Sequence, residues 1–223
     1  MSKRAVFGLF GVGGFAREVM PCALEVLARV FPENNRRNGV YFVDSNPAEK
    51  EVNGIPVISE EEFFLLDCEE RLFNITIADS SVRARVAAEC LAKGAKPLSV
   101  VSNQALRYDA NEVGEGAILC AFSMITSNAK IGRFFHSNLF SYVAHDCQIG
   151  DFVTFAPAVR CNGNVHVHDH VYIGTGAVLK QGLPGKPLVI GAGAVIGMGA
   201  VVTRDVPPNM TVVGNPAKPF LKA

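Results

Sequence analysis

The second half of the chain repeats an apolar residue at every sixth position, with one interruption near residue 180. The repeated positions are Val113, Leu119, Ile125, Ile131, Ser137, Val143, Ile149, Phe155, Cys161, Val167, Ile173, Leu179, Ile190, Ile196 and Val202, of which only Ser137 is polar. The region shows almost no helical periodicity. A period of six is typical of a parallel β-helix, in which short strands coil into a prism.

A second pattern supports this interpretation. The fourth residue after each repeated position is Ala, Ser, Cys or Val, except at Phe135 and Leu183, and a small residue there would also face inward. If three hexapeptides make one coil, equivalent residues of successive coils stack in columns and their backbone groups pair. The Gly- and Pro-rich segment Lys180–Val189 is predicted to be a loop ejected from the coil, and Val206–Phe220 a C-terminal cap.

Charge divides the chain in two, because residues 1–109 carry twice as many charged side chains as residues 110–223. We therefore predict an α/β domain over 1–109 and a β-helix domain with its cap over 110–223. In the first domain, apolar runs alternate with helical patterns, which favours a small parallel sheet of the Rossmann-like type. Strands are expected at 5–10, 40–43, 73–78 and 97–101, and helices at 16–30 and 81–93.

The overall charge is balanced, with 21 basic and 21 acidic side chains, so nucleic acid and anionic membranes are not expected partners. No apolar stretch is long enough for a spanning helix, and no signal-peptide core follows the first residues. We expect a cytoplasmic protein. The six cysteines are scattered without a CxxC motif, which predicts reduced, mostly buried thiols.

A glycine-rich loop, Gly11–Ala16, follows the first predicted strand and opens the first predicted helix. Its bare backbone amides can bind an anion at the helix N-terminus. Asp44 ends the next strand, where a Rossmann-type fold hydrogen-bonds a ribose. The pattern favours a nucleotide. Alternatively, the glycines serve only to let strand and helix pack tightly.

The first candidate for chemistry in the repeat is His145 with Asp146, which fall between two inward positions and hence at an outward corner. A neighbouring carboxylate raises imidazole basicity and can fix its tautomer, as a general base requires. Gly163, one coil further on, is expected to lie directly above His145. A corner without a side chain there would let the backbone amide donate to a developing oxyanion. The alternative is a solvated histidine on a coil corner.

Three alternating histidines, His166, His168 and His170, could bind zinc on an ideal strand. Val167 is a repeated inward position, however, and the coil bends beside it, so the three side chains should diverge. We expect no metal.

Three segments carry a resemblance to a known family: Val143–Phe152 (VAHDCQIGDF), Cys161–Val165 (CNGNV) and Val213–Lys218 (VGNPAK). Together with the GxGG loop they resemble the sugar O- and N-acetyltransferases of the sialic-acid O-acetyltransferase and bacillosamine N-acetyltransferase type. The likeness covers nearly the whole chain. It implies a small Rossmann-like domain followed by a left-handed β-helix, in a homotrimer with acetyl-coenzyme A between neighbouring β-helices.

The resemblance also implies an activity: the transfer of an acetyl group to the 4-amino group of a nucleotide-linked deoxy amino sugar. The product would serve cell-surface polysaccharide biosynthesis. His145 would be the base and Asp146 its partner. The remaining implied contacts are Gly13, Gly14, Phe15, Asp44 and Ser45 for the substrate, and Thr154, Gly163, Thr175 and Met198 for the cofactor. Phe15, Ser45 and Thr154 depart from residues common in the family. O-acetylation of a sialic acid or another sugar is the alternative, and the nucleotide can be UDP, dTDP or GDP.

Overall fold

The computed structural model describes residues 5–31 and 38–220, so the extreme ends of the two predicted domains lie outside the described residues. Contacts divide the chain into two compact units, Met1–Asn103 and Gln104–Ala223. The structural boundary lies slightly before residue 109, where the charge composition changes. Strand β8 (Leu106–Arg107) already belongs to the second unit, since it pairs with β11 (Met124–Ile125) of the repeat region. In the described part of the chain, no helix is both long and apolar enough to cross a membrane.

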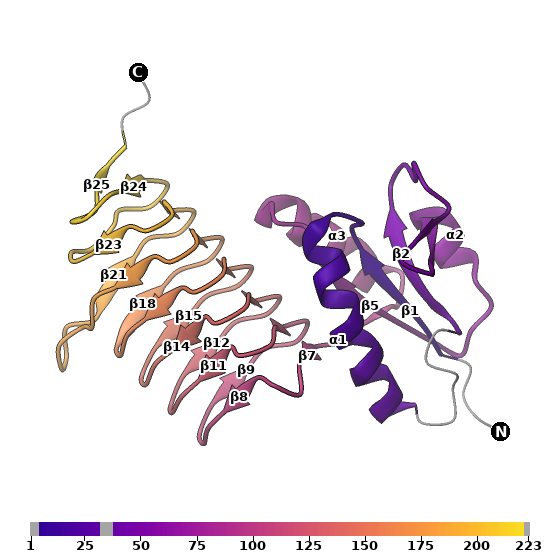
Figure 1. Ribbon diagram of the computed structural model, residues 1–223, viewed down its shortest axis with the longest axis horizontal. Helices are drawn as coiled ribbons and strands as arrows, with labels where there is room; N and C mark the ends of the chain where they lie inside the picture. Colours follow the sequence, from indigo (N-terminus) through magenta and orange to yellow (C-terminus); the bar gives the residue numbers. More distant parts are fainter. Residues whose placement is uncertain (1–4, 32–37, 221–223) are drawn as a thin grey trace. The chain divides into compact units, whose positions relative to one another are not determined.

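The first unit is a twisted sheet with helices packed on it (Figure 1). The strands run in the order β3-β4-β2-β1-β5-β6, and every neighbouring pair is parallel except β3 and β4. The elements are β1 (Ala5–Phe10), α1 (Gly14–Val30), β2 (Val40–Asp44), β3 (Glu51–Val52), β4 (Ile55–Ser59), α2 (Glu60–Leu65), β5 (Glu70–Ile75), α3 (Ser80–Ala92), β6 (Lys96–Pro97) and β7 (Val100–Val101). The predicted parallel α/β architecture is confirmed.

The sequence prediction missed β3, β4 and α2, and it placed the strand at 73–78 too late in the chain. Helix α2 is short and begins with three consecutive glutamates, so it shows little apolar periodicity. A capping box starts it: the Ser59 hydroxyl accepts from the Glu62 amide, and the Glu62 carboxylate accepts from the Ser59 amide. Phe63 of this helix is fully buried and meets the Phe10 ring edge-on at 5.6 Å, which fixes α2 on the sheet.

The second unit is the predicted left-handed β-helix, whose coils stack from β8 to β25 in Figure 1. Its strands form three sheets. One contains β10 (Ile118–Leu119), β13 (His136–Ser137), β16 (Thr154–Phe155), β19 (Tyr172–Ile173), β22 (Val195–Ile196), β24 (Thr211–Val213) and β25 (Lys218–Pro219). The second contains β8, β11, β14 (Tyr142–Val143), β17 (Arg160–Cys161), β20 (Val178–Leu179) and β23 (Val201–Val202). The third contains β9 (Glu112–Val113), β12 (Lys130–Ile131), β15 (Gln148–Ile149), β18 (Val165–Val167) and β21 (Leu188–Ile190).

The register of the sheets confirms the coil length. Val143 pairs with Cys161, and Ile149 with Val167, so each residue pairs with its equivalent three hexapeptides further along the chain. The repeated positions are buried from Leu119 onward. Packing of these columns and the ladder of backbone hydrogen bonds make the prism regular, which places corner residues of successive coils directly above one another.

The corners repeat a left-handed backbone conformation. Asn128, Asp146 and Asn164 occupy equivalent places in three successive coils, with φ of 58°, 60° and 54°. Asn and Asp tolerate this region better than other residues with a side chain. We call the bend between β14 and β15, with those stacked on it, the His145 corner.

The interruption of the repeat is a loop, which projects beside β21 in Figure 1. Val167 pairs with Ile190, although the regular count would pair it with Gly185, so this coil is longer than its neighbours. Leu183 and Lys186 bridge each other in an antiparallel turn. Leu183, which the six-residue count placed inward, is 62% exposed, and Leu188 is buried in its place. The extra residues are therefore 183–187.

The tail ends the stack. Strand β24 pairs with β22 in parallel, and β25 folds back on β24 antiparallel. The Val206 amide also donates to the Val189 carbonyl. These contacts occupy part of the last coil's open edge.

Candidate active site

His145 and Asp146 form a hydrogen-bonded pair at an outward corner. His145 Nδ1 lies 2.8 Å from Asp146 Oδ2, and the two side chains are 51% and 56% exposed. Because a carboxylate can only accept, Nδ1 carries the hydrogen of a neutral ring, and Nε2 is left with a lone pair. The corner therefore presents an accessible proton acceptor whose tautomer is fixed by its neighbour.

Gly163 lies against the His145 ring. A Cβ built on Gly163 would sit 2.4 Å from both Cε1 and Nε2 of the imidazole, so only glycine fits without moving the ring. The Asn164 amide donates to the His145 carbonyl at 2.8 Å and fixes the two coils in register. The predicted stacking of Gly163 on His145 is thus what the structure shows.

The side chain of Asn162, which the sequence analysis did not single out, ties three coils together. Its Nδ2 donates to the Leu179 carbonyl at 2.7 Å, and its Oδ1 accepts from the Tyr142 hydroxyl at 2.8 Å. Burial raises the pKa of Tyr142 above its ordinary value, so the phenol stays a donor at neutral pH. Tyr142 and Asn162 are 20 residues apart in the sequence, and the stacking of successive coils brings them together.

The loop begins on the same corner. The Gly182 amide donates to the Gly163 carbonyl at 3.0 Å, and the Leu188 amide donates to the Asn164 carbonyl at 3.2 Å. Asn164 Nδ2 also donates to the Leu183 carbonyl at 2.6 Å. Both ends of the extra segment are therefore anchored one coil above Gly163.

The remaining predicted cofactor contacts lie elsewhere on the prism. Thr175 is exposed between β19 and β20, and Met198, stacked above it between β22 and β23, is 81% exposed. We call this the Met198 corner, and Phe122 and Phe140 continue it in earlier coils. Thr154 is buried in β16. Within one chain, only Gly163 of the four shares the corner of His145.

In the first unit, three loops meet at the carboxyl edge of the sheet. Strand β1 lies between β2 and β5, so the strand order reverses there, as at a nucleotide-binding crevice. The Gly11 amide donates to the Val43 carbonyl, and the Thr76 amide donates to the Phe10 carbonyl, both at 2.9 Å. Gly11 has φ +108°, and a Cβ on it would meet Thr76 Oγ1 at 2.8 Å, so this position requires glycine.

The predicted substrate residues are grouped at this edge. Helix α1 begins at Gly14 with Gly13 as N-cap, and no side chain caps its first turn. A Cβ on either glycine would meet nothing within 4 Å, and Phe15 follows in the same turn. Asp44 ends β2 and accepts from the Asn46 amide at 2.9 Å, and Ser45 beside it is exposed. The open first turn of α1 can therefore receive an anion.

The loop from Thr76 to Asp79 was missed because the strand before it was placed too late. It brings the N-terminus of α3 to the same edge of the sheet as α1. Asp79 caps that helix by accepting from the Ser81 hydroxyl and from the Ser81 and Val82 amides. The hydrogen bond from the Ser81 hydroxyl is the main reason that the pKa of Asp79 lies below its ordinary value.

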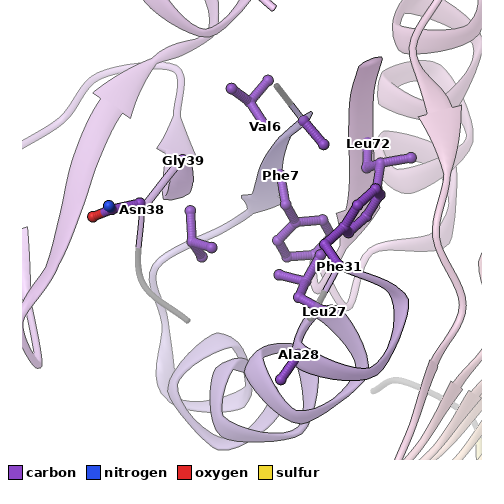
Figure 2. Close-up of a pocket in the computed structure, with 10 residues that line it drawn as sticks. Val6, Phe7, Leu27, Ala28, Phe31, Asn38, Gly39 and Leu72 are labelled. Atoms are coloured by element: carbon purple, nitrogen blue, oxygen red, sulfur yellow. The ribbon is translucent and has the colours of Figure 1, made fainter. Parts of the chain in front are cut away.

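A small cavity in this unit lies at the opposite edge of the sheet, where the strands begin. Figure 2 shows Phe7, Leu27 and Phe31 around it, with Asn38 and Gly39 on the other side. Its volume of about 20 Å³ suits a single water molecule. It is a packing defect between sheet and helix and too small for a nucleotide.

Two larger hollows lie on the β-helix. One of about 370 Å³ follows the outer face of β12, β15 and β18. The other, of about 270 Å³, lies between the loop and residues 203–205, and Lys180, Lys186 and Arg204 line it. His145 lines neither hollow, because it stands on a convex corner.

The expected divergence of the three alternating histidines is found only for His170, because His166 and His168 line the same hollow beside β15 and β18. The His170 ring stacks on Phe152 with centroids 5.4 Å apart, whereas His166 lies on β18 and His168 in the following turn. Burial, and then the nearby His168, lowers the pKa of His166. Among residues 5–31 and 38–220, no three His, Cys, Asp or Glu side chains are grouped so that they could hold a metal ion.

Comparison with known proteins connects this site to a family. Residues 7–90 match the family described as the PglD N-terminal domain. The chain is 46% identical to a GDP-perosamine N-acetyltransferase of Escherichia coli O157:H7, over 96% of this chain and 95% of that protein.

Solved structures agree. WeeI from Acinetobacter baumannii AYE is 47% identical, covers 97% of this chain and 100% of its own, and superposes with a TM-score of 0.92. A His-to-Asn mutant of perosamine N-acetyltransferase from Caulobacter crescentus, in complex with CoA and GDP-perosamine, is 25% identical over 97% of both chains, with a TM-score of 0.84. Each of these three proteins matches nearly the full length of the chain, and so both of its units. The chain therefore belongs to the acetyl-CoA-dependent sugar N-acetyltransferases of the hexapeptide-repeat type.

Proposed function

We propose that the enzyme acetylates the 4-amino group of a nucleotide-linked amino sugar, that His145 is the general base, and that GDP-perosamine is the first substrate to test. The observation that carries the proposal is the His145 ring, held by Asp146 at 2.8 Å and lying against Gly163. The similarity to a GDP-perosamine N-acetyltransferase supports the choice of sugar. It also favours N-acetylation over the O-acetylation that the sequence left open.

The reaction needs a neutral amine, since a protonated one has no lone pair with which to attack a thioester. In our proposal His145 Nε2 accepts the proton as the amine nitrogen attacks the acetyl carbonyl. The C–N bond forms, the C–S bond breaks, and the coenzyme A thiolate takes up the proton. General base assistance of this kind contributes about 10²- to 10⁴-fold. Asp146 keeps the accepting nitrogen free and stabilises the charged ring.

Gly163 would supply the oxyanion contact. Gly163 lies against the imidazole, so a carbonyl oxygen bound to its amide would be within reach of a nucleophile activated by the same ring. One preorganised donor is worth about 10²- to 10³-fold. Direct attack requires no acyl-enzyme, and the nearby thiols of Cys147 and Cys161 are fully buried inside the coil.

The nucleotide would bind at the carboxyl edge of the first unit, with its phosphates at the open first turn of α1 and its ribose near Asp44. The amides of Gly14 and Phe15 would supply hydrogen bonds and the positive end of the helix dipole. A GDP group carries two phosphates for such a site.

We further propose that acetyl-coenzyme A lies between neighbouring β-helices of a homotrimer. His145 stands on a convex corner, and Thr175 and Met198 lie on another corner of the same chain, so a groove containing all three needs a second chain. The Met198 corner also exposes the stacked rings of Phe122 and Phe140, with centroids 5.1 Å apart, and a neighbour would cover this apolar surface. Thr154 is buried in one chain, and cofactor contact there would have to involve its backbone. We expect this trimer in the cytoplasm, serving cell-surface polysaccharide synthesis.

A substrate panel tests the function. The purified protein is incubated with acetyl-CoA and GDP-, UDP- or dTDP-linked 4-amino sugars, and thiol release and product mass are followed. We expect fastest turnover with GDP-perosamine and an acetyl group that resists mild alkali, as an amide does. Turnover with none of these amines, or an alkali-labile ester as product, would overturn the proposal.

A further inference from the structure

The peptide bond between Asn162 and Gly163 is held from inside the coil by a thiol. Cys147 Sγ lies 3.2 Å from the Asn162 carbonyl oxygen, to which it donates. Cys147 is fully buried and follows His145 closely in the chain. The hydrogen bond therefore links the segment that carries the base to the peptide whose other end is the Gly163 amide.

The geometry of a peptide fixes what this contact does. The Asn162–Gly163 bond is trans, since the one cis bond in the described residues precedes Pro216. In a trans peptide the carbonyl and the N–H point in opposite directions. Because the Asn162 carbonyl points inward to Cys147, the Gly163 N–H points away from the coil interior. That N–H has no acceptor among the described residues.

The main chain on either side is held by the bonds from the Asn162 amide to the Leu179 carbonyl and from the Gly182 amide to the Gly163 carbonyl. The nearest donor to the Asn162 carbonyl itself is the Cys147 thiol. The side chain of Asn162 is fixed by Tyr142 and by the Leu179 carbonyl, but these bonds hold the side chain and not the peptide plane. Cys161 Sγ is farther from the carbonyl, at 3.9 Å, and equally far from Cys147 Sγ. The hydrogen bond between the two thiols, together with burial, raises the pKa of Cys161, and the same bond lowers the pKa of Cys147.

We propose that Cys147 is a positioning residue: its thiol holds the Asn162 carbonyl inward and so aims and polarises the Gly163 N–H toward the thioester oxygen. The inference rests on the proposed role of the Gly163 amide. A carbonyl that accepts a hydrogen bond makes the N–H of the same peptide a better donor. Cys147 thus acts on the reaction through Gly163 and never touches the substrate.

Three variants separate this role from simple packing. Cys147→Ala removes the donor, and because one hydrogen bond is worth roughly 0.5–1.5 kcal/mol, kcat should fall about 3- to 10-fold with the KM for acetyl-CoA little changed. Cys147→Ser keeps a donor of similar reach and should restore most of kcat. Cys161→Ala leaves a similar void in the same place but keeps the hydrogen bond from Cys147 to the Asn162 carbonyl, and its kcat should stay closer to wild type.

A spectroscopic readout tests the contact without turnover. In protein labelled with ¹⁵N-glycine, the Gly163 amide resonance of the ligand-free enzyme should shift in Cys147→Ala and return toward its wild-type position in Cys147→Ser. Equal kcat for the two alanine variants, or an unmoved Gly163 resonance, would overturn the inference. A wild-type enzyme that acetylates no amino sugar would overturn the proposed function instead, and the resonance would still report whether Cys147 sets this peptide.

Discussion

The imidazole of His145 covers the Cα of Gly163 so closely that a Cβ there would lie 2.4 Å from two ring atoms. The imidazole and the Gly163 amide are thus placed by adjacent coils, which the hydrogen bond from the Asn164 amide to the His145 carbonyl holds in register. Any side chain at Gly163 must displace the ring.

Gly163→Ala should therefore lower kcat by about 10²-fold, the lower end of what general base assistance contributes, because the methyl group pushes the imidazole out of place. The backbone of Gly163 is not in the left-handed region, so alanine adds steric crowding but no backbone strain. The crowding should lower the free energy of unfolding by about 1–3 kcal/mol. Steady-state kinetics and denaturant unfolding measure the two effects.

A double-mutant cycle identifies the source of that cost. In a His145→Ala background the ring is gone, so Gly163→Ala should no longer destabilise the fold. Additive losses in the cycle would show that the crowding comes from another neighbour.

Replacing the base itself should separate activity from folding. His145→Ala is expected to lower kcat by at least about 10²-fold, with little change in the unfolding midpoint, because the side chain is half exposed and fills no column. His168→Ala, an exposed histidine one coil away, is the matched control and should retain full turnover. Near-normal turnover in His145→Ala would remove the residue from the mechanism.

Asp146 can be tested without disturbing its backbone. At φ 60°, Asp146→Asn keeps a residue suited to the left-handed region. The amide replaces an ionised acceptor by a neutral one, and hydrogen bonds to charged groups are worth about 1.5–3 kcal/mol, so kcat should fall about 10-fold or more, though less than in His145→Ala. Kinetics on both variants test this order. An Asp146→Asn enzyme as active as wild type would show that the contact between the two side chains has no part in catalysis.

At the proposed nucleotide site, one substitution should raise the stability of the fold and weaken substrate binding. In Gly14→Asp the new carboxylate enters open space at the N-terminus of α1, where a negative charge favours the helix. The same charge would repel a phosphate, so the KM for the sugar nucleotide should rise about 10-fold or more, since roughly 1.4 kcal/mol of repulsion suffices for that factor.

The KM for acetyl-CoA should stay the same in this variant, and Gly14→Ala serves as the uncharged control. Measuring both Michaelis constants and the unfolding midpoint checks all three points. Equal increases in both constants would argue against a phosphate site at α1.

Deleting residues 183–187 tests the proposed role of the loop. The deletion restores the regular length of its coil and leaves Leu188 in the inward position, so the prism should fold. If the loop borders the acetyl-CoA site of a neighbouring chain, coenzyme A should bind more weakly while the affinity for the sugar nucleotide stays unchanged. Calorimetry measures both affinities. Light scattering of the wild-type protein should give about three times 23.9 kDa. A fully active monomer would show that one chain builds the groove.

Much of this fold could be read from the sequence because a coiled prism leaves a strict period. Inward positions such as Val143 and Cys161 must be apolar in every coil, and the columns that they predict are the pairs found in the sheets. The same period placed Gly163 above His145. It failed at Leu183 because counting by six cannot tell where extra residues leave the coil, and only burial identifies Leu188 as the inward residue.

Other parts of the site left no signal in the sequence. Asn162 contacts Tyr142, and Cys147 contacts the Asn162 carbonyl, across different coils. These contacts depend on the directions of the side chains, and the six-residue period does not predict those directions. In the first unit, α2 is too short to show an apolar stripe, and the loop after Thr76 was lost with the late placement of its strand. Corner residues such as Thr175 and Met198 could be assigned to a coil but not to a common groove.

The insertion at 183–187 bears on how such an enzyme can diversify. Gly182 and Leu188, which flank it, donate hydrogen bonds to the Gly163 and Asn164 carbonyls, and regular pairing with β18 resumes at Leu188. The length and composition of this segment can thus change while the distance from the His145 ring to Gly163 stays the same. If the loop borders the acetyl-CoA site as proposed, selection for a new acceptor sugar or a different cofactor contact can change this segment and leave the geometry of the rigid coils beneath it intact.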